Sequence, residues 1–205
     1  MVKVLLLVLG LAWTLPALAD ATDPVDLIRQ TSTELFGLIE ENRDSYEANP
    51  QLLKQELRDR LLPRLDTVYS ARLVLGRHGR GLEREQVEAF ADALADLLMD
   101  QYATGLLEFR SRDQIEILPL AGDNTERSTR VRTRVQLDSG TRAPVDYVLR
   151  KTNDEWRVFD VIVEGISYVA TFRNQIGEEI RRDGFDAMLA RLEAGEIDVE
   201  VEIEG

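Results

Sequence analysis

The sequence contains no cysteine and a single histidine, His78, among 205 residues. The absence of cysteine excludes disulfides, thiol catalysis, iron–sulfur clusters and cysteine-ligated zinc. A single histidine excludes any site built from two imidazoles. Basic side chains are also scarce, with 25 Lys and Arg against 38 Asp and Glu, so the formal net charge is -13. This acidic balance argues against nucleic-acid binding, which depends on clustered cations at the phosphates.

Long apolar runs are missing except at the N-terminus. There, residues 4–15 are almost wholly apolar, Lys3 precedes them, and residues 16–19 end in an A-x-A pattern. This order is typical of a secretory signal peptide. The alternative, a membrane anchor, is weaker because roughly twelve apolar residues fall short of the ~20 that span a bilayer. We therefore expect cleavage after Ala19 and an exported single domain formed by residues 20–205.

Motifs for chemistry are equally scarce. The basic turn 76–81 contains His78 but lacks the spacing and the preceding strand of a phosphate loop, so we interpret it as a connection between helices. Asp160 and Glu164 would lie ~13 Å apart on a strand, too far to share a proton. There is no G-x-S-x-G motif and no calcium loop. We expect no catalytic residue, no metal and no cofactor; a hydrolase with His78 as its only base is the remaining enzymatic alternative.

The first half of the chain has helical periodicity. Asp23-Pro24 and Asn49-Pro50 are both N-cap and first-turn signals, and the apolar residues that follow recur at helical spacing. The pattern predicts helices over about 24–46, 50–62, 64–76 and 83–109. At 1.5 Å per residue, the last of these would be ~40 Å long.

From residue 114 the apolar period changes from 3.6 to 2. The pattern predicts strands over 114–120, 125–137, 144–152 and 155–164, then helices over 167–182 and 185–193. Turn residues at 138–140 and 153–154 predict antiparallel hairpins. The predicted fold class is α+β: a helical part over about 24–110, then a curved antiparallel sheet of about four strands wrapped by helices over 111–205.

Three features suggest binding surfaces. The strand 155–164 is apolar on both faces, so it is either covered on both sides or borders a cavity. Arg130, Arg132 and Arg134 share one face of a strand, which indicates either a solvated face or a patch for an acidic partner. The tail 196–204 alternates acidic and apolar residues and could add a strand to a partner's sheet.

The strand 155–164 and the helix after it resemble the MlaC, or toluene-tolerance, family. The residues that carry the resemblance are Trp156, Val158, Asp160, Ile162, Glu164, Gly165, Ile166 and Ser167, followed by Thr171, Arg173 and Gln175. The stretch 69–76, Asn49-Pro50, Leu62-Pro63 and Tyr102 also fit the family. The similarity extends from about Asp23 to Leu192. Ile176, where the family more often has Phe, and the acidic tail depart from it.

The resemblance implies a periplasmic phospholipid carrier with a fold like nuclear transport factor 2. Its partners would be phospholipid, an outer-membrane lipoprotein complex and an inner-membrane ABC transporter complex, and we expect a monomer that does not insert into the membrane. The apolar pattern, in which pocket and ordinary core are not distinguished, supplies the candidate pocket residues Val68, Leu73, Val74, Leu94, Leu98, Tyr102, Leu106, Val145, Tyr147, Leu149, Phe159, Val161, Val163, Ile166, Val169 and Phe172. Alternatives are a binder of another apolar molecule, and a ligand-free adaptor that docks through its tail.

Overall fold

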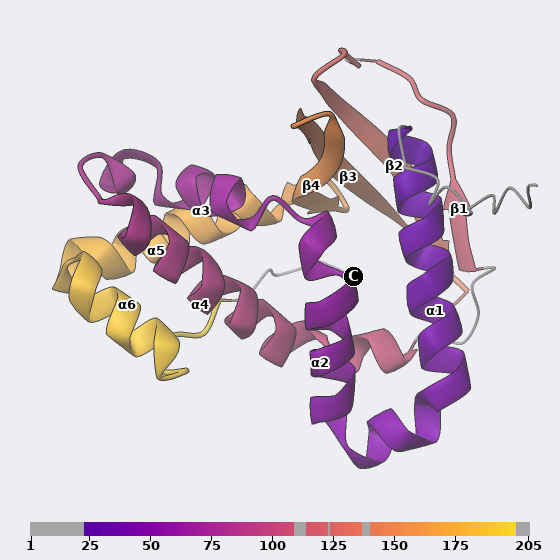
Figure 1. The fold of residues 1–205 in the computed structure, drawn as a ribbon, viewed down its shortest axis with the longest axis horizontal. Helices are drawn as coiled ribbons and strands as arrows, with labels where there is room; N and C mark the ends of the chain where they lie inside the picture. Colours follow the sequence, from indigo (N-terminus) through magenta and orange to yellow (C-terminus); the bar gives the residue numbers. More distant parts are fainter. Residues whose placement is uncertain (1–22, 109–113, 123, 137–139, 200–205) are drawn as a thin grey trace, which may run out of the picture.

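The computed structural model describes residues 23–108, 114–122, 124–136 and 140–199. The predicted signal peptide, the expected cleavage after Ala19 and the turn residues 138 and 139 lie outside these ranges. Figure 1 shows helices α3 to α6 on one side, the sheet on the other, and helices α1 and α2 in front. None of the helices in the described ranges has both the length and the hydropathy needed to cross a bilayer.

The first two helices form a hairpin whose ends are set by capping residues. Helix α1 (Pro24–Ala48) begins after Asp23, whose carboxylate accepts hydrogen bonds from the backbone N–H groups of Val25 and Asp26. Helix α2 (Pro50–Arg60) begins after Asn49, which caps it through Gln51 N–H. The helices meet α4 in a buried cluster made of Ile39, Tyr46, Leu53, Leu57, Met99 and Ala103.

A 3₁₀ turn at Leu62–Arg64 connects the hairpin to helix α3 (Thr67–Leu75), and helix α4 spans Arg84–Tyr102. The prediction of one helix over 83–109 was wrong in length. Helix α4 has 19 residues, ~28 Å rather than ~40 Å, and is followed by a 3₁₀ segment at Thr104–Glu108. The change of winding is visible where Leu106 N–H bonds the carbonyl of Ala103. Gly105, a weak helix former, lies within this segment.

The sheet is an antiparallel meander, as predicted, with five strands rather than about four. Its order is β1 (Ile115–Ile117), β2 (Ser128–Gln136), β3 (Arg142–Thr152), β4 (Glu155–Val163) and β5 (Ile166–Ser167). Both residues of the β3–β4 turn, Asn153 and Asp154, have positive φ, as do Glu164 and Gly165 between β4 and β5. Two such residues are the mark of the tight hairpin turn that matches the strand twist. A two-residue strand such as β5 has no period of its own, so the sequence pattern missed it.

A register shift between Val148 and Leu149 marks an irregularity in the β3–β4 pairing. Such bulges bend a sheet and increase its twist. One face of the sheet packs on α1 through a buried cluster that includes Leu27, Ile28 and Val131. Beyond this bend, β4 approaches α3 and α5. The apolar faces of these two helices belong to a second buried cluster, which they form with α4 and α6.

Helices α5 (Tyr168–Asp183) and α6 (Phe185–Glu193) close the C-terminal side. Residues 196–199 are not a strand: Ile197 and Val199 are buried in the same cluster as α3, α4, α5 and α6. The structure therefore contradicts a free augmentation strand for this part of the tail, because its apolar side chains are already used in the core. Residues 200–204 lie outside the described ranges.

Asp66 joins the helical part to the sheet. Its backbone N–H donates to the carbonyl of Val158 at 2.8 Å, and its carboxylate caps α3 by accepting from Tyr69 N–H. The same carboxylate lies 3.2 Å from the guanidinium of Arg150, which in turn stacks on the Tyr69 ring at 4.0 Å. One side chain thus caps a helix and pairs with a cation on the neighbouring strand.

We expect Asp66→Ala to lower the free energy of unfolding by about 2–3 kcal/mol, because it removes a helix cap and leaves a half-buried guanidinium without its carboxylate. Asp23→Ala is the matched control: Asp23 caps α1 at an exposed end, so we expect a loss of only ~1 kcal/mol. Urea unfolding followed by circular dichroism measures both. Equal losses in the two variants would contradict the joining role of Asp66.

Candidate functional site

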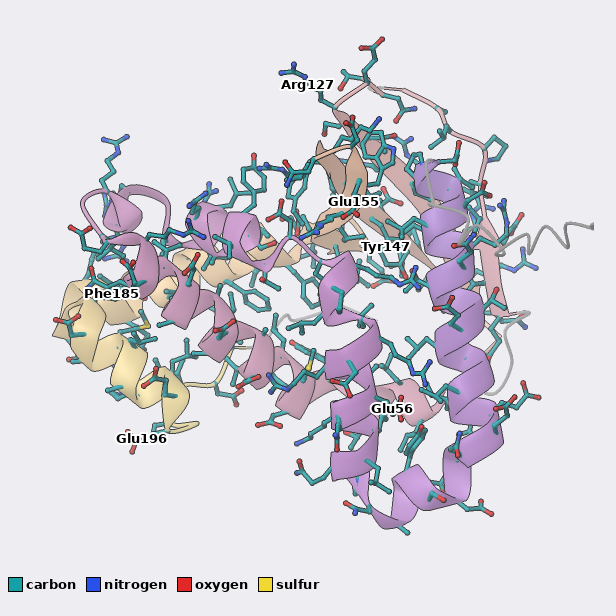
Figure 2. The ribbon with its side chains drawn as sticks, in the orientation of Figure 1. Glu56, Arg127, Tyr147, Glu155, Phe185 and Glu196 are labelled. Atoms are coloured by element: carbon teal, nitrogen blue, oxygen red, sulfur yellow. The ribbon has the colours of Figure 1, made fainter. Side chains whose placement is uncertain are left out.

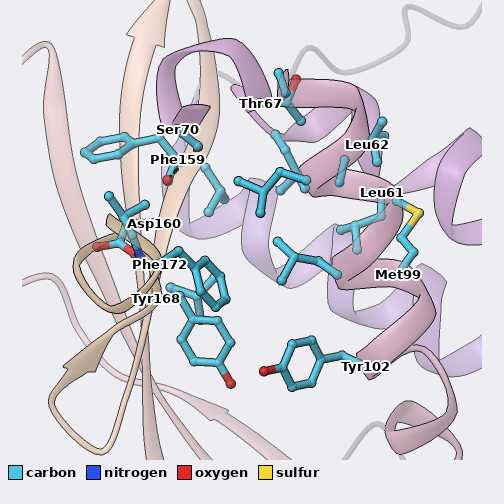
Figure 3. A pocket seen from close by; sticks show the side chains of 18 of the residues that line it. Leu61, Leu62, Thr67, Ser70, Met99, Tyr102, Phe159, Asp160, Tyr168 and Phe172 are labelled. Atoms are coloured by element: carbon cyan, nitrogen blue, oxygen red, sulfur yellow. Dashed lines mark hydrogen bonds between the residues drawn. The ribbon is translucent and has the colours of Figure 1, made fainter. Parts of the chain in front are cut away.

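Two apolar cavities lie between the helices and the sheet. The first has a volume of about 390 Å³ and is enclosed by α2, α3, α4, the start of α5 and β4. Figure 3 shows Phe172 and Tyr168 facing Tyr102 and Met99 across this cavity, with Leu61 and Leu62 on the same side as Met99. Its volume falls within the ~300–1,000 Å³ typical of small-molecule sites.

The second cavity, of about 530 Å³, lies between α1 and the covered face of the sheet. Val145 and Tyr147 of β3 line it together with Leu35 and Phe36 of α1, and Tyr147 is labelled in Figure 2. The two cavities are neighbours, because seven residues line both: Leu61, Leu65, Leu106, Val158, Val161, Val163 and Tyr168. The partition between them is therefore made of apolar side chains and one tyrosine.

Two of the polar side chains on the wall of the first cavity, those of Asp160 and Ser70, are hydrogen-bonded within the chain. Asp160 accepts hydrogen bonds from the Ser167 hydroxyl at 2.6 Å and from the backbone N–H of Val169 at 3.0 Å. Ser70 donates to the carbonyls of Phe159 and Asp66. Because a polar group without a partner is costly in an apolar site, these bonds leave the cavity with an effectively apolar interior.

A group of aromatic rings closes one end of the first cavity. The Tyr168 ring lies 5.8 Å from that of Tyr102 and 5.6 Å from that of Phe172, between ring centroids. In Figure 3 the hydroxyl groups of Tyr102 and Tyr168 point toward each other. Burial, and secondarily the charge of Tyr102 when ionised, raises the pKa of Tyr168. The Tyr168 hydroxyl is therefore a neutral hydrogen-bonding group near neutral pH.

The second cavity has a more polar rim. Thr31 and Ser32 of α1, Arg64 of the 3₁₀ turn and Glu164 of the β4–β5 turn all line it. Tyr147 lies on its β3 wall, and its hydroxyl has no hydrogen bond with any described residue. Burial raises the pKa of Tyr147 to about 12, so this hydroxyl stays protonated. The cavity is thus apolar over most of its wall and polar at one edge.

The structure brings most of the predicted pocket residues together. Twelve of the sixteen line one or both cavities: Val74, Leu94, Leu98, Tyr102, Leu106, Val145, Tyr147, Phe159, Val161, Val163, Val169 and Phe172. The other four lie elsewhere. Leu149 is fully buried in the core between α1 and the sheet. Val68 packs against the buried cluster formed by α3, α4, α5 and α6. Leu73, on α3, and Ile166, in β5, are half-buried and line neither cavity.

The prediction missed the wall between α2 and α3 and the wall formed by α1. The first cavity is lined by Leu57, Leu61, Leu62 and Leu65. The last three of these lie in or directly beside the 3₁₀ turn Leu62–Arg64, which places them on the cavity wall. The signal was present as a leucine-rich segment interrupted by Pro63. The sequence pattern predicts an ordinary helical stripe here, because an interruption does not reveal which side chains turn inward.

The other candidate residues do not form a reactive site. His78 lies on the 3₁₀ turn Gly76–Gly79, outside both cavity walls, and burial together with Arg77 and Arg181 lowers its pKa. On the sheet, Arg130 and Arg132 lie 3.7 Å and 4.0 Å from the carboxylate of Asp146. The predicted cationic stripe is thus partly neutralised by its own sheet. Among the described residues, no group of three His, Asp or Glu side chains is arranged to hold a metal ion.

Comparisons with known proteins agree on one family. The model of the MlaC protein family matches residues 29–194. The chain is 32% identical over 182 residues to the toluene tolerance protein ttg2D of Pseudomonas putida, covering 88% of this chain and 83% of that protein. It is 28% identical to the intermembrane phospholipid transport system binding protein MlaC of Haemophilus influenzae, with 88% and 85% covered.

A solved structure has the same fold. It is the phospholipid-binding protein from Ralstonia solanacearum in complex with a phospholipid, with a TM-score of 0.75, 22% sequence identity, and coverage of 84% of this chain and 96% of that one. The five-stranded open sheet with six α-helices is therefore a fold shared with that protein.

Tyr147 provides a test of how well the second cavity excludes water. Its pKa is about 12 in the folded chain against ~10 when unfolded, so its contribution to stability is complete below pH 10 and is lost as the pH rises toward 12. We expect the wild type to lose about 2–3 kcal/mol more than Tyr147→Phe over this range in urea unfolding. Tyr46 and Tyr168, whose pKa values are also raised, are common to both proteins. Identical alkaline profiles would contradict the burial of Tyr147.

Proposed function

The chain belongs to the MlaC family, and we propose that it is a phospholipid carrier that holds acyl chains in its two apolar cavities. The observation that supports this most directly is the pair of adjoining cavities, one of about 390 Å³ and one of about 530 Å³, with a shared apolar partition. An apolar ligand with two chains joined at one end has the shape that such a partition accommodates.

The energetics of transport favour this use of the cavities. Moving an acyl chain of ~14–16 carbons out of a bilayer costs about 0.8 kcal/mol per CH₂, or ~10–13 kcal/mol for the chain if it were exposed to water. A carrier lowers this cost by replacing water with apolar side chains along the chain length. The first cavity provides that environment, since its carboxylate and its serine hydroxyl are already hydrogen-bonded.

The route of transport is part of the same proposal. We propose that residues 20–205 act as one lipid-binding domain in the periplasm, after removal of the N-terminal segment, and shuttle phospholipid between outer-membrane and inner-membrane complexes. The N-terminal signal-peptide pattern supports export. The name of the Haemophilus influenzae relative, an intermembrane phospholipid transport system binding protein, supports the shuttle. No covalent chemistry is needed for this function.

Native mass spectrometry tests the carrier role directly. Residues 20–205, purified from the bacterial envelope without detergent, should carry a stoichiometric mass increment that extracts as phospholipid. An increment that extracts as another apolar compound would replace phospholipid with that compound as the ligand. A clean protein mass, together with failure to take up lipid from vesicles, would contradict the carrier function altogether.

We expect Val161→Glu to abolish lipid binding while the protein remains folded. Val161 is half-buried and lines both cavities, so a carboxylate there meets acyl chains when lipid is bound and water when it is not. Co-purified lipid should fall more than tenfold, and the free energy of unfolding by no more than about 3 kcal/mol. Lipid extraction and urea unfolding measure the two quantities.

Ile162→Glu is the matched control for this substitution. Ile162 is the next residue of β4, is also half-buried, and faces away from both cavities because side chains alternate along a strand. It should retain bound lipid. Equal lipid loss in both variants, or unfolding of Val161→Glu alone, would show that Val161 belongs to the packed core and not to a lipid site.

A further inference from the structure

Arg64 lies where the two cavities meet. It ends the 3₁₀ turn Leu62–Arg64 between α2 and α3, and its side chain lines the second cavity. Its neighbours Leu61 and Leu65 both line the two cavities. A group at this position is next to the partition, where the two chains of one lipid would join.

Arg64 is also the one cation on either cavity wall among the described residues. The other charged residues there are Asp160 and Glu164. Asp160 is occupied by hydrogen bonds from Ser167 and Val169. The chain has a formal net charge of -13, so cationic side chains are less common in it than anionic ones. Its location at the polar rim of an otherwise apolar site therefore points to recognition of an anionic group.

The guanidinium is held in place and has donors left. Its Nη2 donates to the carboxylate of Glu34 on α1 at 2.7 Å, which fixes the plane of the group. Arg64 makes no other hydrogen bond with the described residues, and its side chain is 26% exposed. A guanidinium has five N–H donors in a rigid fork and two edges that can bind an oxyanion in the bidentate manner, Nε with Nη2 and Nη1 with Nη2. Because Nη2 carries two hydrogens and Glu34 accepts one of them, one complete edge remains for an oxyanion.

We propose that Arg64 recognises the lipid phosphate, the remaining edge of its guanidinium donating to the non-bridging phosphate oxygens while Glu34 holds the guanidinium at the rim. This inference rests on the carrier function proposed above and adds a selectivity to it. A diacylglycerol has the same two acyl chains without the phosphate. Arg64 therefore makes the carrier select phospholipids over uncharged diacylglycerols of equal chain length.

A competition assay measures this selectivity. Lipid-free protein is incubated with vesicles of dioleoyl phosphatidylcholine that contain a minor fraction of dioleoylglycerol and is then re-isolated. Its bound lipids are quantified by mass spectrometry, and their ratio is divided by the ratio in the vesicles. We expect the ratio of bound phospholipid to diacylglycerol to fall about tenfold or more in Arg64→Gln, the range for loss of hydrogen bonds to a charged group. Arg64→Lys, which keeps the charge without the fork, should give an intermediate ratio.

Arg60→Gln is the matched control. Arg60 lies on α2 and pairs with Glu56 at 2.6 Å, but it lines neither cavity, so this variant loses one cation and one ion pair at a distance from the rim. Its lipid ratio should equal that of the wild type. If Arg60→Gln lowers the ratio as much as Arg64→Gln, the effect is general electrostatics and the assignment of Arg64 is wrong.

The outcomes separate this inference from the carrier function. A wild type that takes up neither lipid would contradict the carrier function itself. A wild type and an Arg64→Gln variant that bind lipid in the same ratio would overturn the role of Arg64 and leave the carrier function intact. Should Arg64→Gln fail to fold, Arg64→Lys decides the question alone, with an unchanged ratio counting against the proposal.

Free phosphate is distinguished by a separate titration. Calorimetry of the lipid-free protein with inorganic phosphate should show no binding, because the acyl chains supply most of the affinity of the intact lipid. Binding of inorganic phosphate that disappears in Arg64→Gln would assign the site to the free ion and overturn lipid recognition as the purpose of Arg64.

Discussion

The hydrogen bonds of Asp160 hold one wall of the site in place. This carboxylate, projecting from β4, accepts from the Ser167 hydroxyl and from Val169 N–H, while the same Ser167 oxygen caps α5 by accepting from Ala170 N–H. The start of α5 is thereby fixed against the strand. A negative charge is also favourable at a helix N-terminus. Because Tyr168, Val169 and Phe172 lie in the first turns of α5, their place on the cavity wall depends on this contact.

This arrangement explains a charged residue on the wall of an apolar cavity. In the sequence, the ~13 Å spacing of Asp160 and Glu164 along a strand argues against a shared proton and favours hydrogen bonding or partner docking over chemistry. In the structure the two carboxylates differ in use: Asp160 is engaged by α5, whereas Glu164 lies in a turn of positive φ at the rim of the second cavity. The hydrogen bonds of Asp160 serve to order the wall, so the first cavity presents a largely apolar surface suited to holding an apolar ligand.

Sequence reasoning succeeded where the signal is local. The Asp23-Pro24 and Asn49-Pro50 helix starts, the change of period at residue 114 and the Asn153-Asp154 turn each depend on a few neighbouring residues, and the structure confirms them. It failed where tertiary packing decides. Periodicity identifies both Leu149 and Val161 as inward-facing. In the structure Leu149 belongs to the packed core and Val161 lines a cavity. The difference depends on how the side chains of α1 fill the space opposite each residue, which periodicity does not reveal. The end of α4 and the leucines around Pro63 were missed for the same reason.

Stability and ligand binding are coupled in such a site. A lipid that binds only the folded chain raises the free energy of unfolding by RT ln(1 + [L]/Kd), where [L] is the free lipid concentration. This is about 2.7 kcal/mol when [L] is a hundred times Kd. Arg64 and Glu34 come from different elements, the 3₁₀ turn and α1, and meet at the rim. A phosphate bound there would add to the contacts that hold α1 against the α2–α3 connection. Variants and wild type must therefore be compared at equal lipid content, since a variant that loses lipid will also unfold more easily for that reason alone.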